Sequence, residues 1–132
     1  MSQLTATLPP DVGAPASVRR ELAVLLADDD LDQRLVDEAL VVVSELVTNA
    51  VVHARSTIHV HAEYDHQCLH VEVVDDSAAA PRRHQPGPGA SGGWGLNLVE
   101  ILTTEWGFGP RRDGREGKVV WVNLPFGAPA DC

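Results

Sequence analysis

Apolar residues dominate the stretch 39–54 (ALVVVSELVTNAVVHA), which contains neither glycine nor proline. A run of this length and composition predicts a buried helix. Its polar residues fall on a helical period and therefore form one stripe along the helix. The stripe consists of Ser44, Glu45, Thr48, Asn49 and His53. Glu45 and Asn49 lie one turn apart on the same side. Burying a carboxylate and a carboxamide without partners would cost about 2 kcal/mol or more each, so we expect the stripe to face a polar cavity.

Two helices are predicted in the first half of the chain. Residues 16–27 place their apolar side chains on one face and their charges elsewhere, which is typical of an amphipathic surface helix. The second helix contains the polar stripe and is expected to run from Leu31 to about Ala54, long enough to cross a small domain. Asp30 followed by Gln33 predicts a capping box at its start.

Alternation of apolar and polar positions predicts four strands. Residues 4–8 read as a short edge strand, and residues 118–124 (KVVWVNL) as the last strand. Residues 57–64 and 68–75 are separated by a short connection and predict an antiparallel hairpin with one buried and one wet face. The wet face carries three histidines, His59, His61 and His70. We interpret them as solvent-facing, with a metal cluster as the alternative.

The segment between the hairpin and the last strand differs in composition. Residues 76–93 (DSAAAPRRHQPGPGASGG) are rich in proline and glycine, which predicts an irregular segment that is either disordered or a functional lid. Residues 96–106 return to a helical period, and residues 125–132 are expected to form a flexible tail. This order of elements predicts a single α+β domain, a two-layer sandwich with helices on one face of a mostly antiparallel sheet.

Length and charge narrow the classes of function. The chain has 132 residues, about one domain, and a net charge of −9. The acidic balance argues against nucleic acid as a partner, because phosphate contacts along a strand need Lys and Arg. A single nucleotide stays possible, since backbone N–H groups and a metal ion can hold its phosphates. The sequence shows neither a membrane span nor a signal-peptide pattern, so we expect a cytoplasmic protein.

Three features carry the candidate chemistry. The first is the pair of Glu45 and Asn49 on the long helix. The second is Asp75, which ends the hairpin and is followed by Asp76 and Ser77. The third is the glycine-rich stretch 92–96 at the start of a predicted helix, where free N–H groups and the helix dipole favour an anion. This stretch matches neither a P-loop nor a dinucleotide-binding fingerprint.

In combination the three features resemble the GHKL ATPase superfamily, and more closely the small anti-sigma-factor serine kinases of Gram-positive bacteria. The resemblance covers nearly the whole chain and rests on three boxes in order. Residues 45–50 with His53 resemble the N box, residues 73–77 the G1 box, and residues 93–96 the G2 box. Trp106 with Gly107, and residues 117–121, resemble the closing strands of the family. The resemblance implies a histidine-kinase-like, Bergerat-type ATP-binding fold in which residues 76–93 form the ATP lid.

The same resemblance implies a role for each site residue. Glu45 would act as general base on the attacking hydroxyl. Asn49 would bind Mg²⁺ through its amide oxygen, a hard ligand for a hard ion. Asp75 would accept a hydrogen bond from the adenine amino group. The rest of the implied ATP site consists of Ser77, Gly93, Gly95 and Leu96.

The implied function is that of an ATP-dependent serine/threonine protein kinase. It would hold a sigma factor inactive and phosphorylate a serine of an anti-sigma-factor antagonist, and the family suggests homodimers. Two departures favour alternatives: Trp94 stands where the family usually has Arg, and Val119 where it usually has Thr. One alternative is a nucleotide-sensing protein-binding module with little or no phosphotransfer. The other is an acidic interaction domain that does not use ATP.

Overall fold

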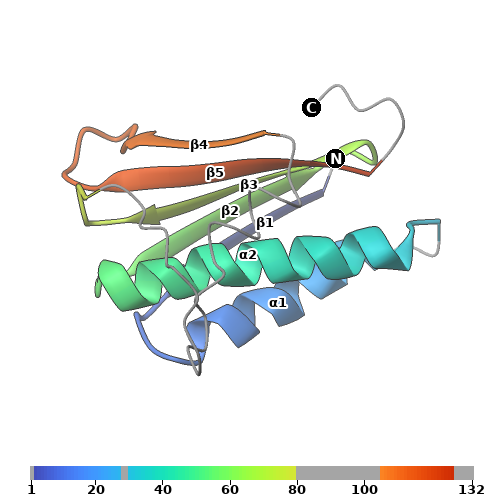
Figure 1. The fold of residues 1–132 in the computed structure, drawn as a ribbon, viewed down its shortest axis with the longest axis horizontal. Helices are drawn as coiled ribbons and strands as arrows, with labels where there is room; N and C mark the ends of the chain where they lie inside the picture. The colour runs from blue at the N-terminus through green and yellow to red at the C-terminus, as the bar shows by residue number, and fades with distance from the viewer. Residues whose placement is uncertain (1, 28–29, 80–104, 127–132) are drawn as a thin grey trace, which may run out of the picture.

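The computed structural model describes residues 2–27, 30–79 and 105–126 as one sheet covered by two helices. Both helices lie on the same face of the sheet (Figure 1), so the predicted two-layer α+β sandwich is confirmed. The elements in chain order are β1 (Ser2–Leu8), α1 (Ala14–Leu25), α2 (Gln33–His53), β2 (Ile58–Tyr64), β3 (Cys68–Asp75), β4 (Glu105–Pro110) and β5 (Lys118–Pro125).

The strand order of the sheet is β1-β2-β3-β5-β4, and every pairing within the described residues is antiparallel. β1 is an edge strand, as its short alternating sequence predicted. The strands β3 and β5 are neighbours in the sheet, although β4 lies between them in the chain. This arrangement places the carboxyl end of β3 beside the amino end of β5, where Asp75 is directly opposite Lys118.

The helix α2 packs its apolar side on the sheet and on α1, as the sequence predicted for residues 31–54. The predicted capping box is wrong. The N-cap is Asp32, whose side chain accepts a hydrogen bond from the backbone N–H of Arg34 at 2.9 Å. Gln33 is already the first helical residue, and its side chain donates forward to Asp37 at 3.0 Å. Within the described residues, no helix has both the length and the apolar character of a membrane span.

The hairpin β2–β3 alternates as predicted, with every second side chain in the core. The other face carries the histidines, and each is engaged by a neighbour. His59 and His61 lie 3.2 Å from the hydroxyls of Thr7 and Thr5 on β1, and His70 lies beside Asn123 on β5. Among the described residues no three metal-ligating side chains are grouped, so the interpretation as surface histidines is favoured over a metal cluster.

Two predictions at the C-terminal end need correction. The helical period placed Trp106 at the end of a helix over 96–106, whereas the family resemblance placed Trp106 and Gly107 in a closing strand. The strand is correct, because both residues lie in β4, which pairs with β5. The rest of that predicted helix, residues 96–104, lies outside the described residues. The tail was expected from Pro125, yet Pro125 pairs with Cys68 in the sheet. Phe126 follows it, donates its N–H to Gln67 at 2.8 Å and packs edge-on against Tyr64. Sheet pairing and an aromatic contact therefore hold both residues.

Candidate functional site

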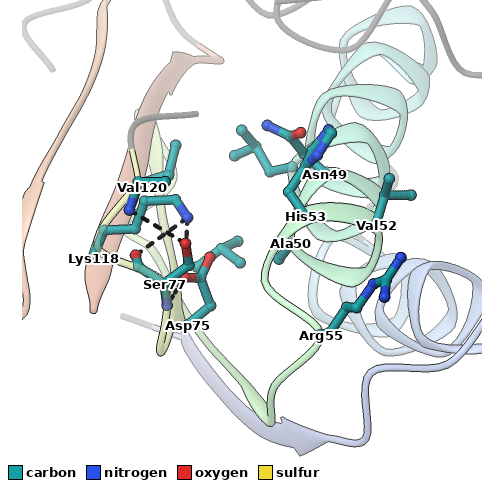
Figure 2. A pocket seen from close by; sticks show the side chains of 12 residues that line it. Asn49, Ala50, Val52, His53, Arg55, Asp75, Ser77, Lys118 and Val120 are labelled. Atoms are coloured by element: carbon teal, nitrogen blue, oxygen red, sulfur yellow. Dashed lines mark hydrogen bonds and ion pairs between the residues drawn. The ribbon is translucent and has the colours of Figure 1, made fainter. Parts of the chain in front are cut away.

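A pocket of about 230 Å³ lies between α2 and the edge of the sheet where β3 ends and β5 begins. Figure 2 shows Asn49 and His53 on the helix side, with Asp75, Ser77 and Lys118 on the sheet side. The described residues that line the pocket are Leu46, Asn49, Ala50, Val52, His53, Arg55, Val73, Asp75, Ser77, Ala79, Lys118 and Val120. The polar cavity predicted beside the stripe of α2 is therefore present, and it joins two of the three boxes found in the sequence.

The helix wall of the pocket presents an unsatisfied amide. Asn49 Oδ1 is shielded from water and has no hydrogen-bond partner within the described part of the chain. A buried amide oxygen without a partner costs free energy, so such a group in a pocket is a candidate ligand contact. His53 is the last residue of α2 and lines the pocket as well. It is therefore in position both to interact with the helix dipole and to face a ligand.

The sheet wall of the pocket contains a buried ion pair. Asp75 Oδ1 accepts from Lys118 Nζ at 3.0 Å and from the backbone N–H of Ser77 at 2.9 Å. Lys118 also donates to the carbonyl of Ser77 at 3.5 Å. The sequence had predicted Asp75 and Ser77 as site residues and missed Lys118. The two-residue period of β5 placed Lys118 on the same face as Val120 and Val122, but its partner strand was not predictable from that pattern.

Glu45 lies apart from this group. It is half-buried one turn before Asn49, and the described residues that line the pocket do not include it. Burial raises the pKa of the Glu45 carboxyl above its ordinary value, and the positive charge of Arg19 on α1 lowers it in part. Arg19 also donates to the hydroxyl of Ser44, the first residue of the stripe, at 3.4 Å. The stripe therefore divides between the pocket and a contact with α1.

The loop that was predicted to cover the site is described only at its start. The backbone N–H of Asp76 donates to the Ser56 hydroxyl at 3.0 Å, and the Asp76 carboxylate accepts from Arg111 at 2.7 Å. Ser77 Oγ accepts from the N–H of Ala79 at 3.2 Å. Three predicted ATP-site residues and one departure lie outside the described residues: Gly93, Gly95, Leu96 and Trp94. Their roles stay predictions.

The side chain of Val119, where the family usually has Thr, does not line the pocket. Strand alternation places its side chain on the opposite face of the sheet, where it lines a different hollow with Glu72 and Val74. The side chain that meets Asp75 across the strand pair belongs to Lys118. The Val119 side chain therefore does not face the pocket, whereas the side chain of the neighbouring Lys118 does.

Gly117 packs closely against the backbone of Asp75, and Gly114 serves as its control in a comparison of two glycine variants. Gly117 has a φ of +137°, and a Cβ built there would stand 2.1 Å from the carbonyl oxygen of Asp75. Gly114 has a φ of +79° and open space around its Cβ position. We expect Gly114→Ala to lower the free energy of unfolding by about 1–2 kcal/mol, because alanine disfavours this backbone conformation. Gly117→Ala should cost clearly more, because Ala would also displace the strand that carries Asp75.

Urea unfolding measures both free energies. A Gly117→Ala variant as stable as Gly114→Ala would contradict the close approach of the two strands.

Comparison with known proteins agrees with this geometry. The model of the family "Histidine kinase-like ATPase domain" matches residues 8–124, so the chain belongs to this family. No curated protein sequence matches the chain significantly. Among solved structures, the chain is similar to the RsbU and RsbW domains of Rv1364c from Mycobacterium tuberculosis, at 26% identity and a TM-score of 0.70. That match covers 98% of this chain and 34% of the other, so this chain spans about a third of that protein.

A second solved structure shows the fold alone. It is the histidine kinase domain of a blue-light activated histidine kinase from Erythrobacter litoralis EL346, at 19% identity and a TM-score of 0.51. The match covers 90% of this chain and 62% of that one. The family match confirms the resemblance to the GHKL, histidine kinase-like ATPases that the sequence boxes indicated.

Proposed function

We propose that this chain is an ATP-binding serine/threonine protein kinase that acts as an anti-sigma factor and phosphorylates a serine of an anti-sigma-factor antagonist. The observation that carries the proposal is the pocket between α2 and the sheet, in a chain of the histidine kinase-like ATPase family. An unsatisfied amide oxygen and a buried carboxylate line the same pocket from opposite walls. The similarity to a structure with an RsbW domain supports a regulatory role.

Asn49 fits the part of a Mg²⁺ ligand. Mg²⁺ prefers oxygen ligands and keeps several of its waters, so one amide oxygen together with nucleotide phosphates can hold it. Asn49 Oδ1 has no hydrogen-bond partner within the described residues and would gain one in the ion. When bound, the ion would neutralise phosphate charge. The protein would contribute mainly positioning, as phosphoryl transfer requires.

The pocket fits a part of the nucleotide rather than all of it. Pockets that enclose a whole small-molecule ligand measure about 300 to 1,000 Å³, whereas this pocket measures about 230 Å³. Its apolar lining from Leu46, Val73 and Val120 suits the faces of a purine ring. We assign the base to the pocket, with its amino group on Asp75. We assign the phosphates to the backbone N–H groups of Gly93, Gly95 and Leu96.

A second candidate function is a nucleotide-sensing module that binds partner proteins without phosphotransfer. The observation in its favour is the position of Glu45, which the described residues lining the pocket do not include. Trp94 in place of the usual Arg points in the same direction, since it removes a positive charge from the glycine-rich box. Under this function ATP would bind with the same requirements, but no partner would be phosphorylated.

Titration with Mg·ATP tests the binding that both functions share. ATP at about 100 times its Kd should stabilise the protein by about 2.7 kcal/mol, because the ligand binds only the folded state. Asn49→Ala should lose the Mg²⁺-dependent part of this effect, with an affinity lower by about 10-fold. Thr48→Val is the matched control, since Thr48 donates to the Ser44 carbonyl on the same helix.

The readout is thermal unfolding with ATP, in Mg²⁺ or in EDTA. An unfolding temperature that ATP leaves unchanged would rule out both functions. Transfer of labelled γ-phosphate to the cognate antagonist then separates the kinase from the sensor.

A further inference from the structure

Lys118 forms an ion pair with Asp75 and lines the pocket, but it has no role in the proposed function. The side chains of Asp75 and Lys118 are 1% and 8% exposed, yet both line the pocket. A buried ion pair is often no more stabilising than a well-packed apolar pair, because both charges lose their hydration. A gain in folding stability therefore does not by itself account for a buried lysine at position 118. Lys118 is moreover the only lysine in the chain, where all other basic charges are arginines.

The pairing of β3 with β5 places both side chains of the ion pair in the pocket. Asp75 and Lys118 are directly opposite in the β3–β5 ladder, so they project from the same face of the sheet. That face looks toward α2, and Figure 2 shows the two side chains meeting across the cavity from Asn49. Val73 and Val120 follow on the same face and line the pocket beside them. The polar pair thus stands next to an apolar surface on which a flat ring can lie.

The hydrogen bonds of the pair leave capacity for a ligand. Within the described residues, the bonds to the Asp75 carboxylate both end on Oδ1, from Lys118 Nζ and from the N–H of Ser77. The ammonium of Lys118 makes one further contact, with the Ser77 carbonyl at 3.5 Å. A carboxylate has two oxygens and an ammonium has three protons. Among the described residues, Oδ2 of Asp75 and one N–H of the Lys118 ammonium are therefore left for a ligand.

We propose that Lys118 is a base-reading residue that acts together with Asp75 on an adenine nucleotide. Adenine presents an amino donor next to ring-nitrogen acceptors. The free oxygen of Asp75 accepts from the amino group, and Lys118 donates to the neighbouring ring nitrogen. A carboxylate alone reads one atom of the base, whereas the pair reads two. The inference rests on the proposed function, because it specifies the base end of the same ATP site.

Base analogues test this contact on the wild-type protein. ADP is compared by calorimetry with 1-deaza-ADP and 7-deaza-ADP, each of which lacks one ring nitrogen near the amino group. One of the two should bind about 10-fold more weakly than ADP, the loss expected for a hydrogen bond to a charged donor. In Lys118→Met the preference for ADP over that analogue should disappear. Lys118→Arg, which keeps the charge, should retain part of it.

A spectroscopic readout makes the test independent of any variant's folding. Because Lys118 is the only lysine, ¹⁵N-lysine labelling yields a single side-chain ammonium signal. This signal should shift on addition of ADP and shift much less with the discriminating analogue.

The outcomes separate this inference from the proposed function. If neither ADP nor ATP binds the wild type, both fail together. If ADP binds while both deaza analogues bind equally well and the ammonium signal stays unchanged, only the role of Lys118 is refuted. GDP presents a carbonyl oxygen and a ring N–H instead, and tighter binding of GDP than of ADP would overturn the assignment of adenine.

Discussion

Asp75→Ala is expected to lower the affinity for Mg·ATP by about 100-fold and to destabilise the fold at the same time. The affinity falls because the carboxylate that accepts from the base is removed. The stability falls because Lys118, whose side chain is 8% exposed, is left with an uncompensated charge. Removing one partner of a buried pair costs about 3–5 kcal/mol. Calorimetric titration and urea unfolding measure the two effects separately.

The double variant Asp75→Ala/Lys118→Met is the control that separates binding from folding. It removes both charges, so most of the lost stability should return. Nucleotide affinity should stay low, because neither the acceptor nor the donor of the pair is present. If the double variant bound ATP as tightly as the wild type, the ion pair would have no part in the site. The stabilities of the wild type, the two single variants and the double variant together yield the interaction free energy between Asp75 and Lys118.

Glu45→Gln should reduce phosphate transfer to the cognate antagonist by about 100-fold to 10,000-fold, the range for loss of a general base. Binding of ATP should change little, because the described residues that line the pocket do not include Glu45. Glu38→Gln is the matched control, since it makes the same chemical change two turns earlier on α2. Transfer that persists in Glu45→Gln would exclude this carboxylate as the base. ATP binding without transfer in the wild type would favour the sensor function.

The pH dependence of transfer adds an independent check on Glu45. A general base works only when deprotonated, so the rate should fall as pH falls through its pKa. Burial raises the pKa of Glu45 and Arg19 lowers it in part, so Arg19→Met should move the acidic limb of the profile to higher pH. Arg20→Met, an exposed neighbour on α1, should leave the profile where it is. An acidic limb that does not respond to Arg19 would assign the titration to another group.

The local patterns of the sequence determined most of the architecture. The polar stripe of α2, the alternating hairpin and the edge strand depend on side-chain periods of a few residues, which the sequence displays directly. The family resemblance implied that Asn49 and Asp75 belong to one ATP site, and they line one pocket. Glu45, which the stripe predicted beside Asn49 in the cavity, is not among the described residues that line it. The error in the predicted N-cap of α2 has a local cause. Asp30 and Asp32 are both acceptable caps, and the choice between them depends on where the incoming chain turns.

The tertiary structure alone decided what Asp75 meets inside the pocket. One of the two neighbours of β3 in the sheet is β5, and Lys118 of β5 lies more than forty residues after Asp75. No periodic pattern in the sequence indicates which strands pair or in what register. A shift of one residue would turn Lys118 to the outer face and bring Val119 in, because successive side chains of a strand point in opposite directions. Sequence therefore determined the chemical groups on each element. Sheet order and register determined that Lys118, rather than Val119, stands beside the Asp75 carboxylate.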